Sequence, residues 1–261
     1  MSGGAHHALE LTAPAGDPDS PVHRLDPRAK IVGLVTVTLV AVSAPLSAWP
    51  VLAACALALA AVAAPARVPP AALWQRVRVV LPLVIVVGVF LPFVRTGGER
   101  WKLGPLTVHE QGLEVLGAVA SKATIGALSA ALLLATTGFP AVLRGLDALR
   151  VPRVFVLITG FTYRYLFVVA AEVGRMRAAV MSRGYAPRTM LRSGAMGRVA
   201  GALFLRTHAR GERVHRAMLA RGWSGSMPQL SPLALRAADA AFVTAILVPL
   251  VALRVALAVA A

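Results

Sequence analysis

The chain has 261 residues, of which 57% are hydrophobic, and its mean hydropathy is +0.72. This composition is too apolar for a soluble domain of this size, and it predicts an all-α polytopic membrane protein. The formal net charge is +16, but arginine and lysine are typical of the cytoplasmic loops of membrane proteins, and no aromatic-interleaved basic patch occurs, so we expect no nucleic-acid partner.

Residues 1–22 are rich in Gly, Pro, Asp and Ser, which predicts a flexible tail without a cleaved signal peptide. His6, His7 and Glu10 are residue types that bind transition metals, but two adjacent histidines in a tail are more often incidental. We therefore expect no metal site in this chain. The single cysteine, Cys55, lies in an apolar run and excludes an intrachain disulfide.

Five transmembrane helices are expected. The apolar run 31–64 is too long for one crossing and carries prolines in its middle, so we expect two short helices joined by a turn. Further spans are predicted at 79–94 and at 113–137, where Lys122 can extend its side chain toward the outer headgroups. The predicted division is a tail at 1–22, spans one to four within 23–137, a cytoplasmic region at 138–230 and the last span within 231–261.

The distribution of arginine sets the orientation. Basic residues flank the first span and follow spans two and four, whereas the first hairpin turn is uncharged, which places the N-terminus in the cytoplasm. The stretch 154–171 is apolar but contains Arg164, which is costly at the centre of a bilayer. Eleven arginines follow between 175 and 221. We therefore predict that 154–171 is an embedded or amphipathic helix that stays on the cytoplasmic side.

The cytoplasmic region contains an internal repeat. Residues 175–185 and 213–223 share the pattern Arg, apolar, basic, any, Ala, two apolar, small, Arg, Gly, aromatic. The two arginines near the end of each copy, Arg183 and Arg221, are 38 residues apart (221 minus 183). The same residue types at the same spacing in both copies indicate two similar helices.

Helical spacing places two apolar residues and one arginine of each copy on the same face. A glycine follows each arginine, where a left-handed conformation would end the helix. The candidate docking residues are Met176, Val180, Arg183 and Gly184 in the first copy, and Val214, Met218, Arg221 and Gly222 in the second.

An arginine in the last turn followed by glycine also has an ordinary explanation, because the helix dipole favours a cation there and glycine is a common stop. Two such endings in one register favour a functional role. In that interpretation each apolar stripe lies in a groove of a partner and each arginine forms a bidentate bond with a partner carboxylate. A partner with two similar grooves, such as a dimer, suits two similar helices.

The chain resembles the transmembrane coupling (T) subunits of energy-coupling-factor importers, most closely the cobalt branch called CbiQ. The residues that carry the resemblance are His23 to Lys30, Val151-Pro152-Arg153, Tyr163-Arg164-Tyr165, Glu172, the first Arg-Gly motif, and Arg213 to Gly225. In that family two Ala-Arg-Gly motifs end the long cytoplasmic coupling helices and dock on ABC-type ATPases. Ala220-Arg221-Gly222 matches this motif, whereas Ser182-Arg183-Gly184 has Ser in place of Ala.

The resemblance implies two ABC-type ATPase subunits and a membrane substrate-capture subunit as partners, within the lipid bilayer of a bacterial inner membrane. ATP would be bound by the partners, because the sequence has no P-loop pattern, and this chain would be a non-catalytic subunit without a cofactor. Cobalt follows from the family branch. The alternatives are a permease for nickel or a vitamin, a protein that binds its substrate directly, a membrane enzyme, and a structural membrane protein.

Overall fold

The computed structural model describes residues 20–45, 48–79, 100–103, 106–184, 194–225 and 233–259, together with positions 82, 84, 86 and 88. It divides the chain into two units, one formed by residues 150–232 and one by 11–149 and 233–261. We call the first the two-helix unit and the second the bundle. Within the described residues the helices are α2 (Pro27–Ser43), α3 (Trp49–Ala66), α4 (Pro70–Val77), α6 (Glu110–Thr136), α7 (Phe139–Ala148), α8 (Arg153–Ser182), α10 (Ala195–Ala220) and α11 (Ala237–Val259).

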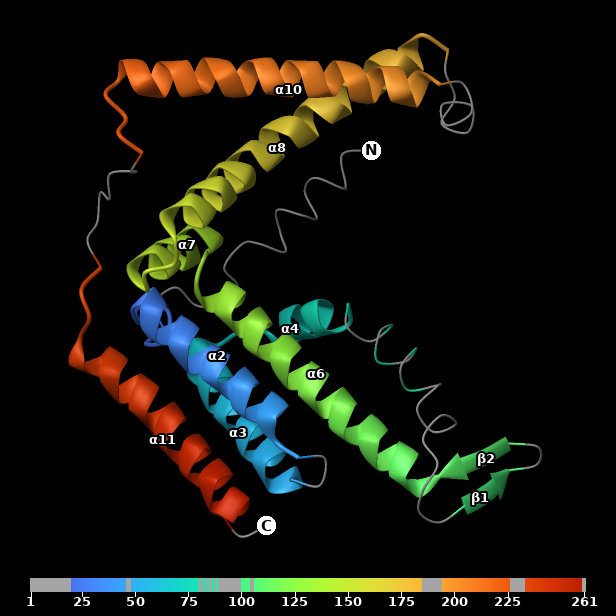
Figure 1. Cartoon of the computed structure of the whole chain (residues 1–261), viewed down its shortest axis with the longest axis vertical. Helices are drawn as coiled ribbons and strands as arrows, with labels where there is room; N and C mark the ends of the chain where they lie inside the picture. Colours follow the sequence, from blue (N-terminus) through green and yellow to red (C-terminus); the bar gives the residue numbers. More distant parts are fainter. Residues whose placement is uncertain are drawn as a thin grey trace. The chain divides into compact units, whose positions relative to one another are not determined.

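The bundle is built around α2, which packs against α3, α6, α7 and α11 (Figure 1). Pro27 occupies the first turn of α2, where a missing N–H costs nothing, and the Asp26 side chain caps the helix by accepting from the Arg28 N–H at 2.9 Å. The core includes Val37, Val51 and Cys55, all with no exposed surface. The buried position of Cys55 agrees with its expected role as a small apolar residue.

The predicted membrane helices are confirmed in part: 31–64, 113–137 and the C-terminal segment are largely helical, but the helices long and apolar enough to cross a membrane include α8 and not α2. The run 31–64 forms α2 and α3 with a turn between them, and α6 and α11 match the expected fourth and last spans. By length and composition, four described helices could cross a membrane: Trp49–Ala66, Glu114–Thr136, Arg153–Ser182 and Ala237–Leu257. The predicted span at 79–94 lies mostly outside the described residues. The all-α prediction holds apart from one short hairpin, in which β1 (Arg100–Leu103) pairs antiparallel with β2 (Leu106–His109).

Polar contacts connect α2, α6 and α11 at the start of α2. The Lys30 ammonium, only 2% exposed, donates to the carbonyl of Thr136 at the end of α6 and to that of His23, both at 3.1 Å. Asp239 at the start of α11 is also 2% exposed, and its carboxylate accepts from the Asp26 N–H at 2.7 Å. The start of α2, the end of α6 and the start of α11 therefore meet at one end of the bundle.

A second set of contacts lies at the other end of α2. The Lys122 ammonium on α6 donates to the carbonyls of Ala44 at 2.6 Å and Val42 at 3.2 Å, so it caps the C-terminus of α2. We had expected this side chain to extend toward the lipid headgroups instead. The Arg254 guanidinium on α11 donates to the Ser43 carbonyl at 3.0 Å. Cations at a helix C-terminus interact favourably with the exposed carbonyls there. α6 and α11 thus each contact both ends of α2.

The two-helix unit consists of α8 and α10 (Figure 1). The apolar stretch 154–171 and the first copy of the repeat belong to one continuous 30-residue helix, α8. The second copy ends the 26-residue helix α10. The sequence repeat therefore corresponds to the C-terminal ends of the two long helices.

Candidate docking surface and basic groove

The two Arg-Gly motifs adopt the same backbone geometry. Arg183 caps α8 with φ −87° and Arg221 caps α10 with φ −93°, while Gly184 and Gly222 follow with φ +84° and +79°. A Cβ on either glycine would meet no atom within 4 Å, so the positive φ and not a lack of space selects glycine. The expected left-handed stop is confirmed in both copies.

Both arginine side chains are exposed, whereas the four apolar docking candidates are half-buried. Met176 and Val180 on α8, and Val214 and Met218 on α10, are less exposed than their immediate neighbours in the sequence. This pattern agrees with the predicted stripe on one face of each helix.

The stripe of α10 has contacts within this chain. Val214 and Met218 line a groove of about 300 Å³ together with Phe161 and Tyr165 of α8 and with Trp223. We expected these residues to lie in a groove of a partner, and here they face the neighbouring helix. The arginine is exposed at each helix end, and the docking role of the stripe residues stays a prediction.

Glu172 links the two helices. Its carboxylate accepts from the Arg206 guanidinium of α10 at 2.7 Å and also forms an ion pair with Arg175, one turn further along α8. Glu172 follows the predicted embedded stretch, which ends at residue 171, and hydrogen bonds from Arg175 and Arg206 lower the pKa of its carboxyl. The two arginines therefore favour the ionised form of this carboxylate.

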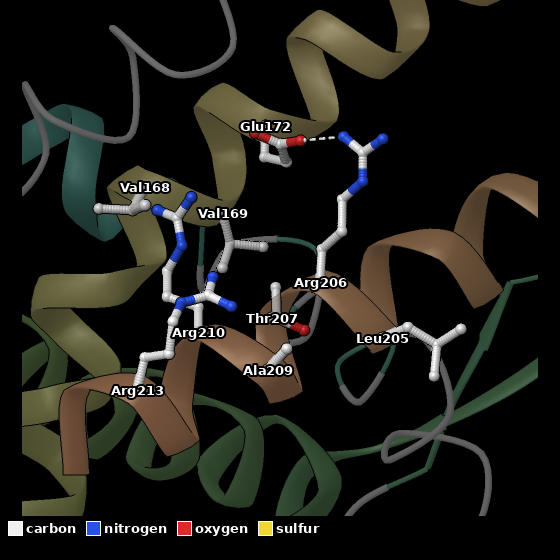
Figure 2. Close-up of a pocket in the computed structure, with 9 residues that line it drawn as sticks. All are labelled: Val168, Val169, Glu172, Leu205, Arg206, Thr207, Ala209, Arg210 and Arg213. Carbon is white, nitrogen blue, oxygen red and sulfur yellow. Dashed lines mark hydrogen bonds and ion pairs between the residues drawn. The ribbon is translucent and has the colours of Figure 1, made fainter. Parts of the chain in front are cut away.

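A groove of about 400 Å³ beside Glu172 collects three arginines of α10. Arg206, Arg210 and Arg213 follow a spacing of four and three residues, so they share one helix face. In Figure 2 the side chains of Arg210 and Arg213 extend from α10 toward Val168 on α8, whereas Arg206 reaches Glu172. The three arginines were not recognised from the sequence as one group, although their spacing was a signal for a basic stripe.

The family of the chain follows from a comparison with known proteins. Residues 18–231 match the model of the CbiQ family, described as cobalt transport protein. The chain belongs to the CbiQ family. The match covers both copies of the repeat and most of the bundle, so the resemblance noted on the motifs is confirmed over most of the chain. This CbiQ-family chain is accordingly a multi-pass membrane protein.

Several curated proteins are similar to parts of the chain. The cobalt transport protein CbiQ of Rhodobacter capsulatus is 34% identical over 169 residues, which cover 64% of this chain and 66% of that protein. A putative ABC transporter ATP-binding protein of Bifidobacterium longum is 34% identical over 134 residues, or 49% of this chain and 17% of that protein. A putative fused cobalt transport protein CbiMQ of Methanocorpusculum labreanum is 26% identical over 216 residues, or 80% and 36%. The chain thus spans between 17% and 66% of the length of these relatives.

Metal-ligating side chains do not gather in the described part of the chain, where no group of three or more His, Cys, Asp or Glu is placed to hold an ion. The tail residues His6, His7 and Glu10 lie outside the described residues.

Proposed function

We propose that this chain is the transmembrane coupling subunit of an ATP-driven importer. It transmits the conformational change of two ABC-type ATPase subunits to a membrane substrate-capture subunit, and the solute is the cobalt ion. The observation that carries the proposal is the pair of exposed arginines, Arg183 and Arg221, at two helix ends of the same geometry.

The geometry of the motif suits docking on a pair of similar proteins. Each guanidinium stands at the end of a long helix, where its planar group can bond a carboxylate with two parallel hydrogen bonds. Two copies of one motif match two copies of one partner. The Bifidobacterium relative, named as an ABC transporter ATP-binding protein, contains a segment similar to this chain, which supports an ABC-type ATPase as that partner.

The connectivity of the bundle supports a cytoplasmic position for the two-helix unit. Lys30 bonds the end of α6, and Asp239 at the start of α11 bonds the Asp26 backbone, so α6 ends and α11 starts at the same end of the bundle. The segment between the end of α6 and the start of α11 must therefore begin and end on the same side of the membrane. A single crossing by α8 would require α10 to cross back, and α10 carries arginines at 198, 206, 210, 213 and 216.

The role is that of a non-catalytic subunit. The sequence has no P-loop pattern, so ATP would be bound and hydrolysed by the partner subunits and no cofactor would be held by this chain. Cobalt is proposed as the solute because the family and the Rhodobacter and Methanocorpusculum relatives are named for cobalt transport. A bacterial inner membrane is the proposed location.

The test is co-expression of the full chain with the ATPase and substrate-capture subunits, with uptake of labelled cobalt as the readout. We expect the ATPases to copurify with this chain and uptake to require it. Excess nickel or a vitamin competing as well as unlabelled cobalt would reassign the solute. Uptake at full rate without the chain, or purification free of any ATPase, would contradict the coupling role itself.

A further inference from the structure

The groove between α8 and α10 has two chambers that adjoin. The basic chamber contains Arg206, Arg210 and Arg213 beside Glu172, and the apolar chamber contains Phe161, Tyr165, Val214, Met218 and Trp223. Val169, Thr207 and Arg210 line both chambers. The groove would suit a ligand with one anionic end and one apolar end, since the arginines gather in one chamber and the large apolar side chains in the other.

The basic chamber contains more arginines than its one carboxylate can pair with. Glu172 is its carboxylate, and both of its oxygens already bond arginines, Arg175 and Arg206. Within the described part of the chain, Arg210 and Arg213 form no hydrogen bond or ion pair with another side chain. Two adjacent guanidinium groups without a carboxylate are a binding site for a phosphate, because each presents several N–H donors in a fixed fork.

The apolar chamber can hold a hydrocarbon chain. Apolar side chains of Phe161 on α8 and of Val214 and Met218 on α10 line it, and a Cβ added at Gly211 would meet no atom within 4 Å. Trp223 is at its edge, and its buried Nε1 has no hydrogen-bond partner. Tryptophan with one apolar side and one polar atom is typical of the membrane interface.

The order of the chambers along α8 matches the orientation of a lipid. The basic chamber lies at the level of Glu172, and the apolar chamber extends back to Phe161, inside the apolar stretch 154–171. That stretch exposes large side chains, with Phe155 at 65%, Ile158 at 59% and Leu166 at 54%. If 154–171 is embedded in the membrane, as the sequence predicts, acyl chains and headgroups follow the same order from the membrane to the cytoplasm.

We propose that this groove binds one anionic phospholipid, with its headgroup phosphate on Arg210 and Arg213 and one acyl chain along the apolar chamber. Such a lipid would fill the space between α8 and α10. Binding would also join the two-helix unit to the cytoplasmic leaflet, which in bacteria carries phosphatidylglycerol.

The experiment is native mass spectrometry of the full chain in detergent, titrated with phosphatidylglycerol or with phosphatidylcholine of the same acyl chains. We expect one phosphatidylglycerol to bind more tightly than phosphatidylcholine. Near a membrane each arginine contributes about fivefold in affinity for anionic lipid, so Arg210→Gln with Arg213→Gln should weaken binding about 30-fold. The matched control is Arg177→Gln with Arg198→Gln, which removes two exposed arginines of the same helices that do not line the groove.

A second variant tests the apolar chamber. Gly211→Leu adds a side chain to the chamber at a position where a Cβ meets no atom within 4 Å, and leucine has a better helix propensity than glycine, so the protein should fold. Binding of long-chain phosphatidylglycerol should fall about 10-fold.

Three results would overturn the proposal. One is equal loss of lipid in the control and in the Arg210/Arg213 variant. Another is competition by inorganic phosphate as strong as that by the lipid, which would show a simple anion site. The third is complete release of the lipid when the partner subunits are added, which would assign the groove to a protein.

Discussion

The bundle and the two-helix unit differ in how many of their residues are buried and hydrogen-bonded within the unit. In the bundle, α2 is covered by apolar neighbours and bonded by α6 and α11 at both of its ends. In the two-helix unit, α8 is described along its whole length and has no fully buried residue, and α10 exposes 68% of Phe204 and 67% of Leu205. The bundle has a buried core and also exposes large apolar side chains, whereas no described residue of the two-helix unit is buried.

This difference indicates a division of roles. Exposed apolar surface of this kind usually marks a contact with lipid or with another protein. The ion pair between Glu172 of α8 and Arg206 of α10 joins these two helices, neither of which has a fully buried residue among those described. Under the proposed coupling role, the two-helix unit would transmit movement and the bundle would anchor it in the membrane.

The largest expected effect comes from the exposed arginines of the two-helix unit. Arg183→Ala with Arg221→Ala should release the ATPase subunits, because each truncation leaves a partner carboxylate desolvated and unpaired. Such losses amount to about 2–5 kcal/mol, or about 30- to several-thousand-fold in affinity. Replacement by Lys should restore binding only in part, because an ammonium cannot form the planar two-pronged bond. Pull-down of the ATPases and cobalt uptake measure the effect.

The control for this experiment is Arg198→Ala, an exposed arginine at the other end of α10. The control should keep both the ATPases and uptake, since an isolated surface charge acts mainly on the rate of encounter. A double variant that retained the ATPases at the level of this control would show that the repeat does not dock them.

The next effect concerns the bundle. Asp239→Ala removes a carboxylate that accepts from the N–H groups of Asp26 and Arg236 at 2.7 Å each, and whose charge interacts favourably with the buried Lys30. Removing one partner of a buried ionic interaction typically lowers the stability by about 3–5 kcal/mol. We expect a clear decrease in the thermal unfolding temperature of the purified chain, with the 57%-exposed Glu212 replaced by Ala as the control. Equal unfolding temperatures would show that Asp239 does not connect α11 to α2.

The sequence predicted the helices of both units well, because hydrophobic blocks and Arg-Gly endings are local signals. The turn before Trp49 and the positive φ of Gly184 and Gly222 follow from the properties of proline and glycine. The motifs in the sequence were also sufficient to suggest the CbiQ family. The division into domains and the docking residues stay predictions, since their tests require partners and a membrane.

Contacts between distant helices were not predictable in the same way. Lys122 was expected to extend toward headgroups, yet it donates to carbonyls that are 78 and 80 residues away in the sequence. Arg206 and Glu172 are 34 residues apart, and nothing in either segment alone identifies the partner. Such pairs depend on how the helices pack, which a single sequence without an alignment does not reveal.

A moderate effect is expected at the other end of α2. Lys122→Met and Arg254→Leu each remove a cation that bonds carbonyls between Val42 and Ala44. Because those carbonyls are at a helix C-terminus and partly accessible, the loss of stability should be about 1 kcal/mol for each change. Thermal unfolding in detergent measures it, with the exposed Arg78→Leu as a control for removal of one charge. A decrease equal to that of Asp239→Ala would mean that this end is as deeply desolvated as the start of α2.

The smallest effect concerns the ion pairs of Glu172, which are accessible to solvent and therefore weak. Because Arg175 and Arg206 lower the pKa of this carboxyl below its ordinary value of 4.5, its contribution is complete above that value and is lost as the pH falls through the lowered pKa. Spin labels on Gly174→Cys and Gly201→Cys, two exposed positions with room for a side chain, report the distance between α8 and α10. The distance distribution should broaden between pH 7 and pH 3. With Glu172→Gln it should be broad already at pH 7 and insensitive to pH. A distribution that stayed narrow at pH 3 in the protein with Glu172 would show that packing, and not this carboxylate, holds the two helices.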